Sequence, residues 1–312
     1  MWHARGMGTI HDLLVAKGKQ GTLNLDVRRE VIEAATEYLG NEDTGIGFLF
    51  SGWCQAALPH KRLPDGQDWQ VDAENISLIV ESGARPGLNG KPVNVGVPFG
   101  ARARMILFYL QSEALRTQSP EVRLGSSMRD WLERMGIPWG GGVVKAVREQ
   151  SERIAYCRLT FHMRRGGKVG LLNQNIIEAA MFEPSMDGSG KLLAENARLS
   201  DGFFQQLQKH PVPIEEAAVK ALSNNSQGLD VYAWLAYRLH ALSKPQPVSW
   251  KALKAQFGLG IGRMVDFRRL FLANVQLALA VYPDAKIEVG DGGMILHPSR
   301  PPVAPRQLAP GS

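Results

Sequence analysis

The sequence predicts an α+β protein that is mainly helical, with tandem winged helix-turn-helix domains behind an N-terminal extension. One observation is the order of elements over residues 228–299, namely a helix, a short helix, a glycine-rich turn, a longer helix with arginines at its start, and a hairpin. The other is that residues 101–172 follow the same order. In such a domain the helix after the turn enters the major groove of DNA, so both copies predict a nucleic-acid partner.

The C-terminal copy begins with an apolar stripe at helical spacing over residues 229–239, and two prolines after it end that helix. Ser249 is placed to cap a short helix, Trp250–Phe257, because its hydroxyl can accept from the first free backbone N–H groups. A turn with three glycines leads to a longer helix over residues 263–282. Two short apolar runs on either side of a Gly-Asp-Gly-Gly turn then predict a hairpin.

The first copy opens with a helix over residues 102–118, a short strand and a second, capped helix. A Gly-Ile-Pro-Trp-Gly-Gly-Gly turn then leads to a helix over residues 143–156, which we predict to be the first recognition helix. The hairpin that follows is predicted to be the wing. Its basic tip, with Arg164, Arg165 and Lys168, is expected to lie along the phosphate backbone. The second recognition helix is the longer helix of the C-terminal copy.

The chain is expected to divide into four parts. Residues 1–44 form a helical arm, residues 45–198 a first winged-helix domain with preceding strands and loops, residues 199–299 a second winged-helix domain, and residues 300–312 a disordered proline-rich tail. The two short helices of the arm are expected to pack on the first domain, because such short helices are marginal alone; a dimerisation arm is the alternative. The run over residues 83–93 lacks phosphate-loop spacing and is interpreted as a plain loop.

The positive charge is concentrated in the two copies. The whole chain carries a net +6 and has a pI of about 9.4. Residues 101–169 contain 13 lysines and arginines against 6 acidic residues, and residues 228–299 contain 8 against 5, so the rest of the chain is acidic in balance. This distribution favours a polyanionic partner at the two predicted domains.

Candidate DNA contacts are the lysines and arginines that the pattern places on the recognition helices, on the first wing and on the helices beside them. Arg263 is expected to reach a base edge, because it stands at the start of the second recognition helix. Met264, Phe267 and Phe271 carry the inward face of that helix. The full candidate set is Arg102, Arg104, Lys145, Arg148, Arg153, Arg164, Arg165, Lys168, Lys251, Lys254, Arg263, Arg268 and Arg269.

Catalytic and metal-binding readings find little support. The seven histidines are scattered and no zinc-ligand spacing occurs, so we expect no metal, no cofactor and no enzymatic activity. The glycine run after Phe257 follows a helix rather than a strand and lacks the context of a dinucleotide site. Cys54 and Cys157 lie in apolar runs, which predicts buried, reduced thiols in a cytoplasmic protein. No apolar run approaches the ~18 residues of a membrane span.

Several long strings in this order resemble the RepA-type plasmid replication initiators of Gram-negative bacteria. They include VGVPFGARARMILFYLQSEALRTQS, LGSSMRDWLERMG, REQSERIAYCRLTF and HPVPIEEAAVKALSNNSQGLDVYAWLAYRLHAL, and the likeness covers roughly residues 45–303. The resemblance implies a protein that binds double-stranded origin DNA at repeated sites, helps to melt adjacent DNA, and recruits the host initiator and the replicative helicase. Related initiators exchange between dimers and DNA-binding monomers, and the sequence leaves undecided whether this chain forms a homodimer.

Three functions are therefore weighed. The leading one is a non-enzymatic origin-binding initiator with two winged helices. A DNA-binding transcriptional repressor, acting for example on its own promoter, is the second. The third is an interaction scaffold that does not bind DNA and whose charge is incidental.

Overall fold

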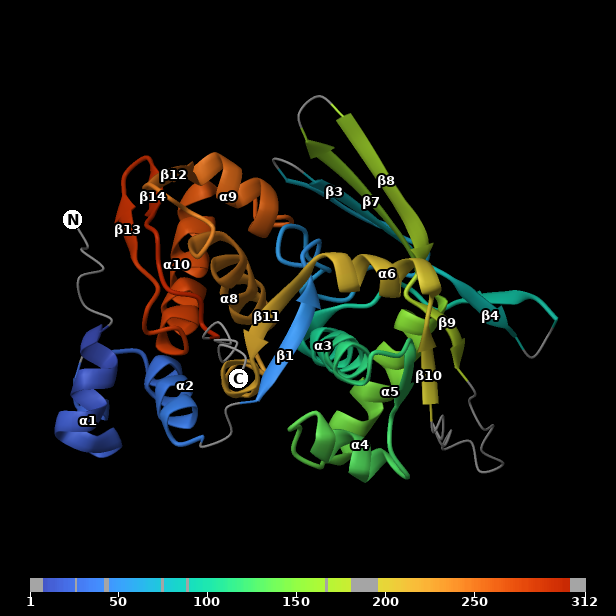
Figure 1. Cartoon of the computed structure of the whole chain (residues 1–312), viewed down its shortest axis with the longest axis horizontal. Coiled ribbons are helices and arrows are strands. Elements are labelled where there is room, and N and C mark those ends of the chain that lie inside the picture. Colours follow the sequence, from blue (N-terminus) through green and yellow to red (C-terminus); the bar gives the residue numbers. More distant parts are fainter. Residues whose placement is uncertain are drawn as a thin grey trace, which may run out of the picture.

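Two repeats of one element order make up most of the fold, and their first helices, α3 and α8, pack against each other (Figure 1). The structure is a computed structural model that describes residues 8–25, 27–41, 45–73, 76–87, 90–165, 168–180 and 196–303. Its mixture of helices and strands confirms the predicted α and β class. The end of the predicted tail, from residue 304 on, lies outside the described residues.

The first repeat runs from α3 to β10. Among the described residues its strands form a three-stranded antiparallel sheet in the order β6-β10-β9. In this sheet β10 pairs with β6 on one edge and with β9 on the other. Its elements are α3 Gly100–Thr117, β6 Glu121–Arg123, α4 Met128–Arg134, α5 Gly141–Tyr156, β9 Ile177–Ala180 and β10 Asn196–Leu199.

The second repeat runs from α8 to β14 and pairs its strands in the same way, in the order β12-β14-β13. Gly293 opens β14, and a Cβ there would lie 2.1 Å from the carbonyl oxygen of Val248, so glycine is what lets β12 and β14 pair this closely. The two repeats thus share one topology. The elements are α8 Ser226–Leu239, β12 Gln246–Ser249, α9 Trp250–Phe257, α10 Met264–Ala280, β13 Ile287–Gly290 and β14 Gly293–Leu296.

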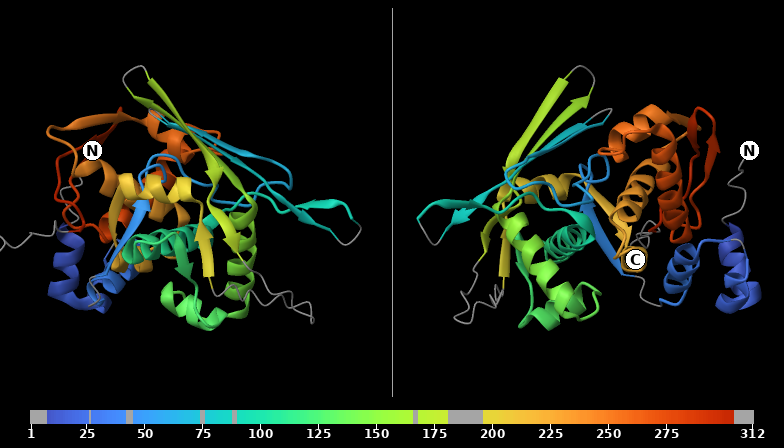
Figure 2. Two further views of the ribbon diagram at one scale, coloured as in Figure 1. Left: turned by 45° about the vertical axis from the view of Figure 1, so that its right-hand side comes forward. Right: turned by 180° about the vertical axis from the view of Figure 1, so that it is seen from behind.

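The hairpin predicted to be the first wing belongs to a different sheet. It consists of β7 Arg158–Arg165 and β8 Lys168–Asn175, and β7 pairs with β3 Ile76–Glu81. With β2 Trp69–Asp72 these strands form the sheet β2-β3-β7-β8, which projects from the body (Figure 2). The apolar strand β3 lies inside this sheet, where it pairs with β2 on one edge and with β7 on the other.

In the three-stranded sheet of the first repeat, β9 and β10 correspond in pairing to β13 and β14 of the second repeat. The hairpin β7–β8 is therefore an insertion between α5 and β9. The sequence also predicts a turn-rich run over residues 182–192, within the connection between the copies, and this run lies outside the described residues.

Side-chain caps start several helices as the sequence predicts. The hydroxyl groups of Ser127, Ser200 and Ser249 accept hydrogen bonds from backbone N–H groups in the first turns of α4, α6 Asp201–Lys209 and α9. The inward face of α10 is also confirmed: Phe267 and Phe271 are fully buried and stacked, with ring centroids 5.2 Å apart, and Met264 packs against the same core.

The N-terminal arm packs on the second repeat rather than on the first, which corrects the predicted position. It contains α1 Gly8–Leu23, interrupted at Gly18, and α2 Arg29–Leu39. Helix α2 lies against α10 and against α7 Glu216–Ala221, and it buries Val31, Ile32, Ala34 and Ala35. The apolar side of α2 thus finds its partner in helices more than 170 residues away in the sequence.

Two short antiparallel pairs complete the fold. Strand β1 Ile46–Phe50 pairs with β11 Pro211–Glu215 beside α3, between the two repeats (Figure 1). The run over residues 83–93, interpreted as a plain loop, contains instead the hairpin β4 Ala84–Pro86 and β5 Pro92–Asn94. All six residues of these two strands are exposed.

Candidate nucleic-acid interface

The start of α10 presents one face to the core and the opposite face to solvent. Arg263 occupies the cap position of α10, its side chain is 80% exposed, and its Nε donates to Asp266 Oδ2 at 2.7 Å. Arg269 and Leu270 are exposed one turn further on, and Val265 lies on the same side. The structure therefore leaves this end of the helix accessible to a large partner.

Two other cations predicted to bind DNA hold this region together. The Arg268 guanidinium lies 5.1 Å from the ring centroid of Trp250 and donates to the Asp291 carbonyl oxygen at 3.2 Å. It therefore joins α10 to α9 and to the β13–β14 turn. The Lys254 ammonium donates to the Gly262 carbonyl oxygen at 2.8 Å and closes the glycine turn before α10. Lys251, on α9, is exposed.

The start of α5 is open in the same way. Gly140 caps the helix, and a Cβ built on Gly141 or Gly142 would meet no atom within 4 Å. Because glycine has no side chain, nothing on Gly141 or Gly142 shields the first backbone N–H groups, and such groups favour anions. Lys145 is exposed one turn further on, and Arg148 is half-buried.

The acidic residues of α5 are neutralised by arginines. Glu149 forms ion pairs with Arg153 at 3.0 Å and with Arg62 at 3.7 Å, and Glu152 pairs with Arg85 of β4 at 2.8 Å. These carboxylates consequently oppose a polyanion less than their formal charge suggests.

Three predicted DNA contacts are used inside the protein. The Arg153 guanidinium is buried, donates to the Val97 carbonyl oxygen at 3.0 Å and lies 5.2 Å from the Phe99 ring centroid. The Arg104 side chain is only 10% exposed and is held by Asp230. A buried, fully engaged guanidinium cannot reach a phosphate, so the prediction of Arg104 and Arg153 as DNA contacts is wrong. Arg102 is half-buried, and burial lowers its pKa.

Arg102 and Arg104 instead belong to the seam, by which we mean the contact between α3 and α8. Arg104 Nε and Nη2 donate to the two carboxylate oxygens of Asp230, each at 2.6 Å, and Arg104 Nη2 also donates to the Leu58 carbonyl oxygen. Arg102 donates to the Asn224 side chain at 2.7 Å. Burial and the Arg104 guanidinium lower the pKa of neighbouring His60 to about 4.

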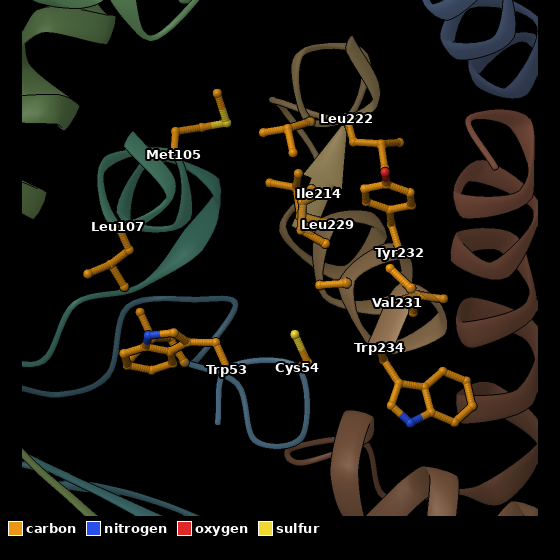
Figure 3. Packing of buried hydrophobic residues seen from close by; sticks show 14 of the residues in the cluster. Trp53, Cys54, Met105, Leu107, Ile214, Leu222, Leu229, Val231, Tyr232 and Trp234 are labelled. Carbon is orange, nitrogen blue, oxygen red and sulfur yellow. The ribbon is translucent and has the colours of Figure 1, made fainter. Parts of the chain in front are cut away.

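The rest of the seam is apolar and lines a small pocket of about 50 Å³. Met105 of α3 and Leu229 of α8 lie on its two sides, with Trp53 nearby (Figure 3). This pocket is too small for a nucleotide or a cofactor, and we interpret it as imperfect packing between the repeats.

The remaining candidates, Arg164, Arg165 and Lys168, lie at the end of the inserted β7–β8 hairpin. Their backbones form strand pairs, but their side chains lie outside what the structure describes. Their role as phosphate contacts stays a prediction, although the hairpin is not the wing of the first repeat.

The sequence reasoning missed some exposed residues at these helix starts. Trp139 is exposed just before α5, with the Arg129 guanidinium 4.9 Å from its ring centroid. Val265 is exposed at the start of α10. The sequence signals for these residues were a tryptophan within a Gly-Pro-rich turn and a valine outside the stripe of Met264, Phe267 and Phe271. In the described part of the chain no group of three His, Cys, Asp or Glu side chains could hold a metal ion.

Comparison with known proteins confirms the resemblance seen in the sequence. Residues 97–251 match the family model of the plasmid encoded RepA protein, a stretch that holds the whole first repeat and the start of the second. None of the curated proteins matches the chain. No helix among the described residues has the length and apolar character needed to cross a membrane.

A solved structure supports the overall fold. A crystal structure of domains 2 and 3 of RctB, as SeMet derivatives, is similar with a TM-score of 0.51 and 12% identity, over 80% of this chain and 99% of that chain. A second RctB structure, of domains 2–3, gives a TM-score of 0.44 at 11% identity, over 77% and 84% of the two chains. The first similarity shows that a similar overall fold occurs in a known protein.

Proposed function

We propose that this chain, whose residues 97–251 belong to the family of plasmid-encoded RepA proteins, initiates plasmid replication by binding origin DNA with its two repeats. The observation that carries the proposal is the shared topology of the repeats. Each has a helix, a strand, a helix, a turn, a longer helix and two further strands, with the first strand paired to the last. This is the element order of a winged helix-turn-helix, in which the helix after the turn reads the major groove.

The exposed groups at α5 and α10 fit that role. Arg263, Arg269 and Lys145 are exposed near the starts of these helices, and the acidic residues nearby are paired with arginines. Arginine can bind guanine O6 and N7 with two hydrogen bonds, and lysine neutralises phosphate. The glycine start of α5 lets a phosphate approach the backbone N–H groups.

The proposal includes no catalytic step. Melting of the adjacent DNA and recruitment of the host initiator and helicase would follow from binding at the origin. A transcriptional repressor would use the same contacts, and the RepA family match favours the initiator. Supplying the protein in trans to an origin plasmid separates the two, because only an initiator maintains the plasmid.

The direct test is selection from random duplex DNA, followed by affinity measurements on the selected site. Arg263→Ala should weaken binding by ~1–3 kcal/mol, as for loss of a base contact. Arg29→Ala is a matched control, because Arg29 is 79% exposed and pairs with Glu33 at 2.7 Å, much as Arg263 pairs with Asp266. If Arg263→Ala and Arg269→Ala both bind as tightly as the parent, α10 does not read the groove.

A further inference from the structure

Val265 is an apolar side chain that lies largely in solvent in the described part of the chain. It is 71% exposed, whereas Phe267 and Phe271 of the same helix are fully buried. A β-branched residue also lowers helix propensity slightly, so an exposed valine in the first turn does not help α10 to form. Its side chain is therefore available for contact with a partner.

The surroundings of Val265 combine apolar and cationic groups. Arg269 lies one helical turn further on the same face, and Arg263 precedes Val265 at the cap of the helix. The single carboxylate of this first turn, Asp266, is paired with Arg263. Glycines of the preceding turn leave the approach open: a Cβ built on Gly260 or Gly262 would meet no atom within 4 Å.

Duplex DNA offers a surface that complements this arrangement. In the major groove, thymine presents its C5-methyl group beside the hydrogen-bonding edges of neighbouring base pairs, and apolar side chains contact that methyl group. Phosphates and guanine edges would meet the two guanidinium groups. A protein partner could also cover a valine, but two flanking cations at an open helix start favour a polyanion.

We propose that Val265 determines sequence specificity by packing its methyl groups against the C5-methyl group of a thymine. This inference rests on the proposed function, because it requires α10 to lie in the major groove. It adds a residue that reads a base by apolar contact to the arginines that would bind base edges or neutralise phosphates.

The test removes one methyl group at a time from the DNA. In the selected site each thymine is replaced by deoxyuridine, and affinity is measured by fluorescence anisotropy for the parent and for Val265→Ala. For the parent, one replacement should weaken binding about fourfold, as expected for one buried methyl group. For Val265→Ala that same replacement should have no effect, while other positions keep the parental response. Val15→Ala is the control, because Val15 is an 82% exposed valine on α1.

Each other outcome overturns the inference in a recognisable way. If Val265→Ala retains the full response to deoxyuridine at every position, another group senses the methyl. If no position responds in the parent, thymine methyl groups are not read at all. If Val265→Ala binds DNA as the parent does but abolishes self-association in sedimentation, the valine belongs to a protein interface. Failure of the proposed function is distinct, because the parent would then select no duplex site.

Discussion

Replacing Asp230 with asparagine tests whether one ion pair holds the two repeats together. Asp230 of α8 accepts two hydrogen bonds from Arg104 of α3, each at 2.6 Å, and both side chains are only 10% exposed. The guanidinium also donates to the carbonyl oxygens of Leu58, Pro59 and Gly100. The asparagine keeps the shape of the side chain but removes its charge, so it leaves a buried guanidinium without a counterion.

The magnitude follows from burial. Breaking a buried ion pair by removing one charge costs ~3–5 kcal/mol. A domain is stable by only ~5–15 kcal/mol in total, so Asp230→Asn should lower the free energy of unfolding by a large fraction. In a double-mutant cycle with Arg104→Met, the double variant should lose clearly less than the sum of the two single variants, because no unpaired charge is left in the seam.

Urea unfolding at pH 7, followed by circular dichroism and tryptophan fluorescence, measures these effects. Unfolding of Asp230→Asn in two separate steps would mean that the pair couples otherwise independent repeats. A free energy within about 1 kcal/mol of the parent would refute the reasoning, because exposed positions behave in this way and buried ion pairs do not.

Two further predictions concern pH and salt. His60 has a pKa of about 4 in the folded chain against an ordinary value of 6.5, so the unfolded chain binds the proton more readily between these values. The free energy of unfolding should therefore keep its full value above pH 6.5 and fall by about 2 kcal/mol between pH 7 and pH 5. Urea titrations at each pH measure this dependence, and His60→Gln should flatten it. A plot of log K, where K is the association constant for DNA, against log[salt] should fall with a slope of about 0.9 for each phosphate contact. Lys145→Ala should reduce the size of this slope by about one. An unchanged slope for Lys145→Ala would mean that the start of α5 does not contact phosphate.

The sequence predicts best those parts of the fold that short-range chemistry decides. Helices α4, α6 and α9 begin where Ser127, Ser200 and Ser249 can cap them, because the hydrogen bonds that start a helix lie within four residues. Strands β11 and β12 were missed because each exists only through a distant partner. Pro247 of β12 suggested only a helix stop, yet proline is tolerated there because β12 lies at the edge of its sheet.

The candidate site shows the same limit. Helical spacing placed most of the candidate cations on helices that the structure contains, but it could not separate outward from inward side chains. Helix α3 illustrates the reason, since it is buried on several sides: Ala103, Leu107 and Gln111 are buried as well as the predicted apolar stripe. On such a helix an arginine can point inward if a carboxylate meets it, and Asp230 comes from another helix 126 positions along the chain.

The seam also determines how far apart the two proposed recognition helices lie. Helix α5 packs on α3, α3 packs on α8, and α8 packs on α10, so the four helices follow one another across the molecule (Figure 1). Packed helices lie ~8–10 Å apart, so three such steps separate the axes of α5 and α10 by at most ~30 Å. Successive major grooves on one face of DNA lie ~34 Å apart. This upper value is close to the groove spacing, so the proposal of two repeats in adjacent grooves of one duplex is compatible with the size of a single chain. If the two repeats bind adjacent grooves as proposed, the ion pair between Arg104 and Asp230 would help to set their spacing without touching DNA.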